Sequence, residues 1–409
     1  MIRVELAIIP DVRLPEKARR ASLKGSPSRC KLLLMTDIHA LLTLMVSKGA
    51  SDLFLTHGAA PHIKIEGFTH PVNAPPFKSG EVKQLAHSIM TERQTAAFEE
   101  TMEANLSLSV DGVGRFRVNV FYQRGEVAMV ARLIKSNIPT IEQLGLPPAC
   151  ANLAMLKRGL VLVVGAAGSG KSTSLAAMIG HRSANADGHI LTIEDPIEFL
   201  FPHRQSLVDQ REVNIDTRSF GDALRNAMRA APDVIMIGEI RDEETAKHAI
   251  AYAETGHLCV STMHANNANQ AIERIINFFS EQAQKQLLMD LSLNLQGVIS
   301  QRLIPTPDGK LALATELMIL TAYVSDLIQK GRVDEIKELM SKGDEVGMHT
   351  FDQSLYDLYT AKRISLQDAL RYADSHTDLA LRVRLSDHHP ADAQPLTVND
   401  LHGMQSTRT

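Results

Sequence analysis

The sequence predicts an α/β protein. A small amino-terminal α+β domain is followed by a larger α/β domain with a helical carboxyl-terminal region. Two patterns along the 409 residues support this class. In the first part, short segments alternate apolar and polar residues, which is typical of antiparallel strands with one solvated face. After a proline-rich stretch, continuous apolar runs alternate with helical segments, which is typical of a parallel sheet covered on both faces.

The composition is ordinary for a globular protein, with 44% hydrophobic and 22% charged residues. The formal net charge of -4 gives no basic excess, and aromatic residues make up 4% with no Trp. Both observations argue against a nucleic-acid-binding protein. The three cysteines, Cys30, Cys150 and Cys259, form no CxxC pair and fit a reducing cytoplasm. No apolar run approaches the roughly 20 residues of a membrane-spanning helix.

Residues 1–34 differ in composition from the rest of the chain. They are rich in Arg and Lys, and they lack the apolar core and cleavage site of a secretory signal. We expect a disordered extension, or translation from a start codon upstream of the native one at Met35. At the other end, residues 386–409 are polar, and we expect a flexible tail.

Residues 35–138 are expected to form the amino-terminal α+β domain. Asp37 can cap a helix with apolar residues on one face. Short strands are expected at 53–55 and 63–65, followed by a helical stretch from Gly80 to Glu103. Three alternating segments then flank turns at 111–112 and 124–125. This pattern predicts an antiparallel meander.

Residues 139–150 contain several prolines and are interpreted as a linker. Residues 151–385 are expected to form the larger domain with its helical carboxyl-terminal region. The region from Glu281 to Tyr372 is expected to be mostly helical. Apolar runs predict buried strands at Leu160–Val164, Ile190–Ile193, Val234–Ile237 and Leu258–Thr262.

A phosphate-binding motif follows the first of these strands. It fits G-x-x-x-x-G-K-[ST] at every fixed position and reads Gly165-Ala166-Ala167-Gly168-Ser169-Gly170-Lys171-Ser172. Glycines allow the backbone N–H groups to converge on phosphate oxygens, and the following helix directs its positive end there. We expect Lys171 to reach the β- and γ-phosphates and Ser172 to ligate Mg²⁺. The sequence therefore predicts that residues 165–173, ending at Thr173, bind ATP with Mg²⁺.

Carboxylates follow two further strands. Glu239 comes directly after the strand Val234–Ile237 and Gly238. Ligands of open α/β sheets bind at the carboxyl ends of the strands, so we expect Glu239 to orient or deprotonate the attacking water. Glu194 and Asp195 follow a second strand, and carboxylates there can hold Mg²⁺ or its water ligands. The alternative for this pair is a capped turn set by Pro196.

Histidine and arginine residues complete the predicted site. His264 follows the strand Leu258–Thr262 and is expected to sense the γ-phosphate, with His257 before that strand as a second candidate. Arg115 and Arg117 share one face of a strand, and Arg132 lies on the next. We expect these arginines to contact the phosphates of ATP bound by a neighbouring domain. The alternative is that they are solvated surface arginines.

Together these motifs resemble the ATPases of secretion systems and type IV pili. The resemblance covers roughly residues 36–372. Besides the phosphate-binding motif it rests on the acidic box Ile193–Phe199, the stretch Gly238-Glu239-Ile240-Arg241-Asp242, the histidine box from Ala253 through His264, and Arg115-Phe116-Arg117-Val118-Asn119. It is closest to the PilT/PilU retraction branch, because the longer amino-terminal region and four-cysteine insert of the assembly and type II secretion ATPases are missing.

Two segments near the carboxyl end indicate which member of the retraction branch the chain resembles. PilT carries an Ala-Ile-Arg-Asn-Leu-Ile motif. The corresponding segment of this chain is Ser325-Asp326-Leu327-Ile328-Gln329-Lys330 and departs from that motif. A later segment, Gly347-Met348-His349-Thr350-Phe351-Asp352, is similar to PilU. The resemblance implies a PAS-like amino-terminal domain, a RecA-like P-loop domain and a homohexameric motor. It also implies a cytoplasmic location at the inner membrane, through a pilus platform protein, and possible work beside a second retraction ATPase.

Three functions are compatible with these residues. The first is an ATP-hydrolysing motor for pilus retraction and twitching motility, of the accessory PilU type. The second is a pilus-assembly or type II secretion ATPase. The third is a nucleotide-binding modulator of another pilus motor, which the departure at Ser325–Lys330 favours. A RecA-like nucleic-acid motor is a more distant alternative, and no nucleic-acid partner is expected.

Overall fold

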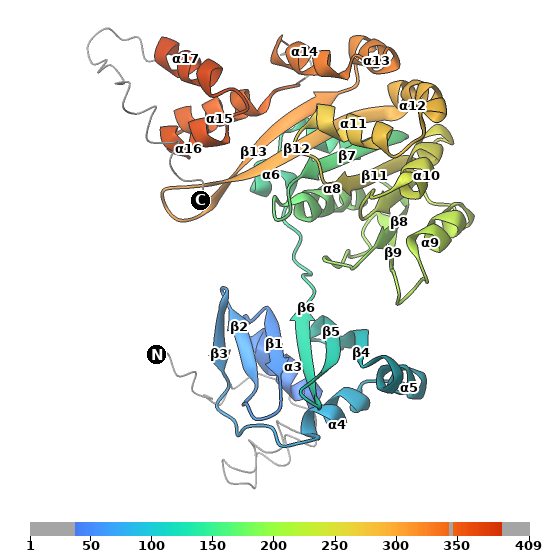
Figure 1. Ribbon diagram of the computed structural model, residues 1–409, viewed down its shortest axis with the longest axis vertical. Coiled ribbons are helices and arrows are strands. Elements are labelled where there is room, and N and C mark those ends of the chain that lie inside the picture. The colour runs from blue at the N-terminus through green and yellow to red at the C-terminus, as the bar shows by residue number, and fades with distance from the viewer. Residues whose placement is uncertain (1–36, 343–346, 387–409) are drawn as a thin grey trace. The chain divides into compact units, whose positions relative to one another are not determined.

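The computed structural model describes residues 37–342 and 347–386 (Figure 1). The expectations for residues 1–34 and for the segment after Ser386 lie outside the described residues. The chain divides into two compact units, residues 1–138 with 189–231, and residues 139–188 with 232–409. No helix among the described residues is both long enough and apolar enough to cross a bilayer.

The first unit contains an antiparallel sheet of six strands in the order β3-β2-β1-β6-β5-β4. The strands are β1 (Asp52–Leu55), β2 (His62–Ile65), β3 (Phe68–Pro71), β4 (Glu103–Val110), β5 (Gly114–Gln123) and β6 (Glu126–Leu133). The predicted meander is confirmed as β4-β5-β6. Its last strand also pairs with β1, which joins the meander and the early strands into one sheet.

Three helices pack with this sheet: α3 (Ile38–Ser47), α4 (Glu81–Ser88) and α5 (Glu92–Thr101). The predicted cap is confirmed, because the Asp37 side chain accepts the His39 N–H at the start of α3. The helical stretch expected from Gly80 to Glu103 is two helices rather than one. Thr91 and Gln94 form a reciprocal capping box that starts a new helix at Glu92. Phe98 of α5 is fully buried in the core.

Residues 189–231 of the first unit contain most of β8 (Gly188–Glu194), then β9 (Ser206–Glu212), α9 (Phe220–Ala227) and the 3-10 helix η1 (Met228–Ala230). Strand β8 contains the predicted strand at 190–193. Strand β9 was not predicted, because its sequence ends in Asp-Gln-Arg-Glu and carries too few apolar residues to mark a buried strand.

The second sheet has seven strands in the order β13-β12-β7-β11-β10-β8-β9. Its strands from the second unit are β7 (Gly159–Gly165), β10 (Val234–Ile237), β11 (Leu258–Met263), β12 (Leu295–Pro305) and β13 (Leu311–Ile319). Strand β7 runs parallel to β11 and β12, and β11 runs parallel to β10. Every residue of β7, β10 and β11 is buried, which confirms a parallel arrangement covered on both faces.

Helices of the second unit cover these strands (Figure 1). Helices α8 and α10 both pack on β7 and β11. Helix α8 also packs against α6 and α7, and helix α10 also packs against α12. The segment interpreted as a linker contains α6, which starts at a capping box between Thr140 and Gln143. The bounds are α6 (Ile141–Leu144), α7 (Ala149–Ala154), α8 (Lys171–Asn185), α10 (Glu243–Glu254), α11 (Ala268–Asn277) and α12 (Glu281–Asn294).

The carboxyl-terminal region is helical but not throughout. It contains α13 (Ala322–Gln329), η2 (Val333–Glu335), α14 (Ile336–Lys342), α15 (Phe351–Thr360), α16 (Leu366–Tyr372) and α17 (His376–Ser386). The expectation of a mostly helical stretch was wrong for residues 295–319, which form β12 and β13. Strand β13 is rich in Leu and Ala, which are good helix formers. Its pairing with β12, from Pro305 opposite Leu311 to Gly297 opposite Ile319, overrides that propensity.

Candidate functional site

The phosphate-binding loop joins β7 to α8 in the second unit. Gly168 and Gly170 have φ angles of 77° and 90°, a conformation that other residues rarely adopt. At Gly165 a Cβ atom would lie 2.4 Å from Ser169 Oγ and 2.7 Å from the Gln301 carbonyl oxygen of β12. Helix α8 begins at Lys171, so its positive end faces the loop. The motif therefore has the strand, turn and helix that phosphate binding requires.

The polar groups of this loop fit a chain of phosphates. Ser169 Oγ is buried and has no hydrogen-bond partner among the described residues. A buried hydroxyl without a hydrogen-bond partner lowers the stability of the folded chain. A phosphate oxygen that accepted a hydrogen bond from this hydroxyl would remove that cost. The Lys171 ammonium donates to the carbonyl oxygens of Gly165 and Ala166, at 2.9 and 3.0 Å, and so already lies over the loop. A bound nucleotide supplies the γ-phosphoryl group that hydrolysis transfers to water.

Three of the predicted site residues come together beside this loop. His264 Nδ1 lies 3.4 Å from Lys171 Nζ, and His264 Nε2 lies 3.4 Å from Glu239 Oε1. An ammonium group can only donate, so Nδ1 is the acceptor of the contact with Lys171, and Nε2 is the ring nitrogen beside the Glu239 carboxylate. His264 thereby links the lysine of the phosphate-binding motif to the carboxylate expected to act on the attacking water.

Two hydroxyl residues of β11 hold the turn that presents Glu239. Ser261 Oγ donates to the Ile237 carbonyl oxygen and Thr262 Oγ1 donates to the Gly238 carbonyl oxygen, each at 2.7 Å. The Thr262 carbonyl oxygen accepts the Ile240 N–H at 2.9 Å, on the far side of Glu239. Sequence reasoning missed both residues. The available signal was a pair of adjacent hydroxyls at the end of an otherwise apolar, buried strand.

The alternative candidate His257 lies at the opposite end of β11 from His264. It precedes the first residue of the strand, and its Nδ1 atom lies 3.3 Å from the Tyr252 carbonyl oxygen and 3.2 Å from Thr255 Oγ1. These partners belong to the end of α10 and the turn after it. Because ligands bind at the carboxyl ends of parallel strands, this position favours a local structural role.

Glu194 ends β8 in the first unit, and Asp195 follows it. Glu194 is 6% exposed, and its Oε1 atom accepts hydrogen bonds from Thr192 Oγ1 at 2.7 Å and Gln210 Nε2 at 3.0 Å. Burial raises the pKa of Glu194 to about 7, against these hydrogen bonds, which lower it. Such a carboxyl group can take up or release a proton near neutral pH. Asp195 is exposed. The action of either residue on a nucleotide stays a prediction.

The three predicted arginines lie on β5 and β6. The alternation in β5 is confirmed, with Phe116, Val118 and Val120 buried and Arg115 and Arg117 on the other face. Arg115 Nη2 donates to Ser107 Oγ at 3.2 Å. Burial raises the pKa of Glu212, and the positive charges of Arg115 and Arg117 oppose that shift. Arg132 forms an ion pair with Asp52, with 2.6 Å between Nε and Oδ1. Contact of these arginines with phosphate stays a prediction.

Comparison with known proteins places this architecture in a family. A family model described as "Type II/IV secretion system protein" matches residues 31–359, most of the chain. The chain belongs to the type II/IV secretion system protein family. This family member is 53% identical to the type IV pilus ATPase PilU of Pseudomonas aeruginosa over 357 residues, which are 87% of this chain and 94% of PilU. It is 41% identical to the type IV pilus retraction ATPase PilT of the same organism over 333 residues, 81% of this chain and 97% of PilT.

A solved structure of a family relative supports the fold. The crystal structure of the pilus retraction motor PilT with bound ADP matches with a TM-score of 0.79 at 42% identity, covering 84% of this chain and 99% of that one. The predicted combination of an amino-terminal α+β domain with a RecA-like domain is thereby confirmed. Within the type II/IV secretion system protein family, the chain is a nucleotide-binding ATPase of the PilT/PilU type.

Proposed function

We propose that this chain is an ATP-hydrolysing motor that drives the retraction of type IV pili, and that it is of the PilU type. The observation that carries the proposal is the 53% identity with PilU, which extends over 94% of that protein. The contacts among Lys171, His264 and Glu239 support it, because they bring a phosphate-binding lysine and a carboxylate to one edge of a parallel sheet.

The roles of the site residues follow from their chemistry. The backbone and side chains of residues 165–173 cradle the phosphates of ATP, with Lys171 neutralising charge that develops on the γ-phosphoryl group. Glu239 orients the attacking water or takes its proton. His264 lies 3.4 Å from both Lys171 Nζ and Glu239 Oε1 and keeps that carboxylate near the phosphate-binding loop.

Mg²⁺ is the metal that this donor set fits. No group of three or more His, Cys, Asp or Glu side chains able to hold a metal occurs among residues 37–342 and 347–386. Mg²⁺ usually takes one or two protein ligands and completes its shell with phosphate oxygens and water. We propose the Ser172 hydroxyl and the Asp195 carboxylate as the protein ligands that would hold Mg²⁺. We assign a catalytic role to Glu194, and the ion would supply charge neutralisation at the phosphates.

Assembly provides the remaining part of the proposed mechanism. The chain forms a homohexamer in the cytoplasm, and Arg115, Arg117 and Arg132 stabilise charge on ATP bound by a neighbouring domain. The ring acts on an inner-membrane platform protein of the pilus and works beside a second retraction ATPase. The family resemblance motivates these partners, and no nucleic acid takes part.

The proposal is tested with Lys171→Ala as the single copy of the gene. Loss of the phosphate-binding ammonium should abolish ATP turnover by the purified protein and abolish or reduce twitching of the cells. Lys157→Ala is the matched control, because Lys157 is an exposed lysine of the same unit. Cells that twitch normally with Lys171→Ala would overturn the motor function, provided that the variant is expressed at the level of the wild type.

Two alternatives are separated by further measurements. A deletion strain should keep its pili, or gain them, if the chain is a retraction motor, and should become bald if it is an assembly ATPase. The stretch 325–330, which lies in and just after α13 and departs from the PilT motif, favours a modulator of another motor. Steady-state ATP turnover by the purified chain without a partner would remove the main support for a modulator.

A further inference from the structure

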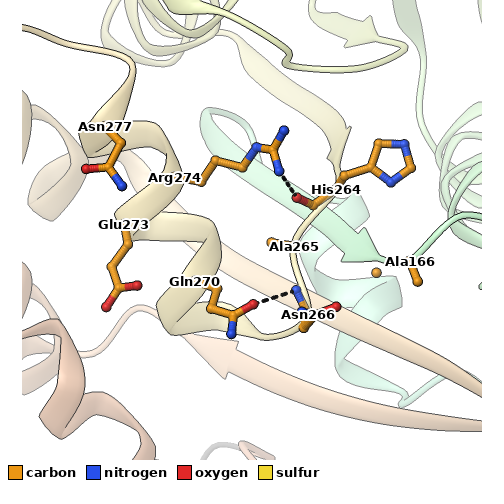
Figure 2. Close-up of a pocket in the computed structure, with 9 residues that line it drawn as sticks. Ala166, His264, Ala265, Asn266, Gln270, Glu273, Arg274 and Asn277 are labelled. Atoms are coloured by element: carbon orange, nitrogen blue, oxygen red, sulfur yellow. Dashed lines mark hydrogen bonds between the residues drawn. The ribbon is translucent and has the colours of Figure 1, made fainter. Parts of the chain in front are cut away.

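The loop that carries His264 is tied to one face of α11 (Figure 2). Residues 264–267 connect β11 to this helix. Arg274 Nη1 donates to the carbonyl oxygen of His264 at 2.8 Å, and the Asn266 N–H donates to Gln270 Oε1 at 3.2 Å. Gln270 and Arg274 are one helical turn apart and therefore project from the same face of α11. Two side chains of one helix thus bond to the loop backbone at two points.

The helix that provides these two side chains is itself anchored. Asn267 caps α11 by accepting the Gln270 N–H at 2.9 Å. The Ala268 N–H donates at 2.8 Å to Glu316 Oε1 of β13, and the Glu316 side chain also accepts a hydrogen bond from Ser300 Oγ of β12. Glu316 is 2% exposed. The start of α11 is therefore fixed to the sheet, which gives Gln270 and Arg274 a rigid base.

A pocket of about 430 Å³ lies beside the loop, so packing supports that side of the loop only weakly. It is lined by Ala166 of the phosphate-binding loop, by His264 and Asn266, and by Gln270, Glu273 and Arg274 of α11. In Figure 2, the Arg274 side chain extends from α11 to the His264 backbone. The hydrogen bonds from Arg274 and Gln270 therefore hold the loop on the side that faces the pocket.

We propose that Arg274 is a positioning residue for ATP hydrolysis, acting through the backbone of His264, with Gln270 as a second support. The His264 imidazole lies 3.4 Å from both Lys171 Nζ and Glu239 Oε1. A shift of the loop lengthens at least one of these contacts, and a misplacement of about 1 Å at a reacting group can reduce a rate by about 10²-fold. The inference rests on the proposed role of His264 in ATP hydrolysis.

The test uses Arg274→Met in the full chain, which keeps the length of the side chain and removes the donor. We expect kcat to fall by about 10-fold while KM for ATP changes by less than about 2-fold, because the phosphate-binding loop is intact. Arg274→Lys should recover part of the rate, since an ammonium donates a single, less directed bond. Glu273→Gln is the matched control. Glu273 is the neighbouring exposed residue of α11.

Two readouts separate positioning from general stability. Hydrogen–deuterium exchange of the peptide that spans residues 264–267 should rise in Arg274→Met but not in Glu273→Gln, with an unchanged melting temperature. Arg274→Met should also cost little further turnover when His264 is already alanine, because its effect passes through His264. If Arg274→Met fails to fold, Gln270→Met applies the same two readouts to the second hydrogen bond.

The outcomes are distinguishable from failure of the proposed function. Wild-type protein without ATP turnover would count against the motor itself, and the exchange measurement would still test whether Arg274 holds the loop. Normal turnover in the wild type together with an undiminished kcat in Arg274→Met would overturn the positioning role alone. An equal loss in the His264→Ala and wild-type backgrounds would likewise overturn it, because Arg274 would then act independently of His264.

Discussion

The Nε2 atom of His264 lies 3.4 Å from Oε1 of Glu239. The two residues follow neighbouring parallel strands, β11 and β10, and are therefore presented at the same edge of the sheet. The hydroxyls of Ser261 and Thr262 fix the turn before Glu239, and α11 holds the loop that contains His264. The distance between the two side chains thus depends on hydrogen bonds that lie outside the motifs themselves.

Glu239→Gln should separate ATP binding from hydrolysis. The substitution leaves the phosphate-binding loop unchanged and keeps a side chain of the same size beside His264, but it removes the base. We expect ATP affinity close to that of the wild type and a turnover lower by about 10²–10⁴-fold. Equilibrium binding of a fluorescent ATP analogue and steady-state phosphate release would measure the two effects. Loss of binding would instead show a structural or metal-binding role for Glu239.

Arg117→Ala tests whether an arginine of the first unit acts across a subunit interface. Arginines that reach a neighbouring site contribute about 10³–10⁵-fold to turnover in other phosphoryl-transfer enzymes. We expect a loss toward the lower end of that range, with the mass of the assembled particle unchanged. Arg93→Ala, an exposed arginine on α5, is the control. A rate per subunit equal to that of the wild type would make Arg117 a surface residue.

Arg132 should contribute to stability whether or not it contacts phosphate. Its partner Asp52 is 3% exposed and lies directly opposite Arg132 where β1 pairs with β6. Arg132→Ala leaves the buried Asp52 carboxylate without its ion pair, although Asp52 Oδ2 still accepts the Ser51 hydroxyl at 2.7 Å, so we expect a loss of about 1–3 kcal/mol in unfolding free energy. Urea denaturation measures this loss. In a background of Asp52→Asn the same substitution should cost less, and an equal cost in both backgrounds would contradict the ion pair.

The unfolding free energy of the Glu316→Gln variant, relative to that of the wild type, should increase as pH rises. Burial raises the pKa of Glu316, so the folded chain holds this proton more tightly than the unfolded chain. Between the ordinary carboxyl pKa of about 4.3 and the raised value, the folded state binds more protons, and the unfolding free energy of the wild type falls with pH. The glutamine carbonyl oxygen can still accept the Ala268 N–H and does not titrate.

The measurement for Glu316→Gln is a series of urea denaturations between about pH 5 and pH 8. The difference in unfolding free energy, variant minus wild type, should increase as pH rises above the ordinary carboxyl pKa and should become constant above the raised pKa of Glu316. Glu273→Gln serves as the control for loss of a negative charge in the same unit, because Glu273 is exposed whereas Glu316 is buried. A difference that does not depend on pH would mean that Glu316 ionises in the folded chain as it does in water.

Much of the site could be predicted because its signals are local. The phosphate-binding motif needs a strand, a glycine turn and a helix in one contiguous segment, and β7 and α8 flank it as expected. Glu239 and His264 could be assigned to one edge because each follows a continuous apolar run. The helical expectation failed at β13, where residues that favour a helix are held as a strand by pairing with β12.

The sequence by itself determined the strands β7, β8, β10 and β11, the phosphate-binding loop and the carboxylate and imidazole that accompany it, because each is encoded in neighbouring residues. Tertiary structure alone decided which distant residues support them. The close approach of Gly165 to the Gln301 backbone and the bond from Arg274 to the His264 carbonyl depend on segments brought together by folding. Every residue has a backbone carbonyl, so the sequence does not show which carbonyl a side chain will contact. A side chain that acts by donating a hydrogen bond to a backbone carbonyl is therefore recognised only in the folded structure.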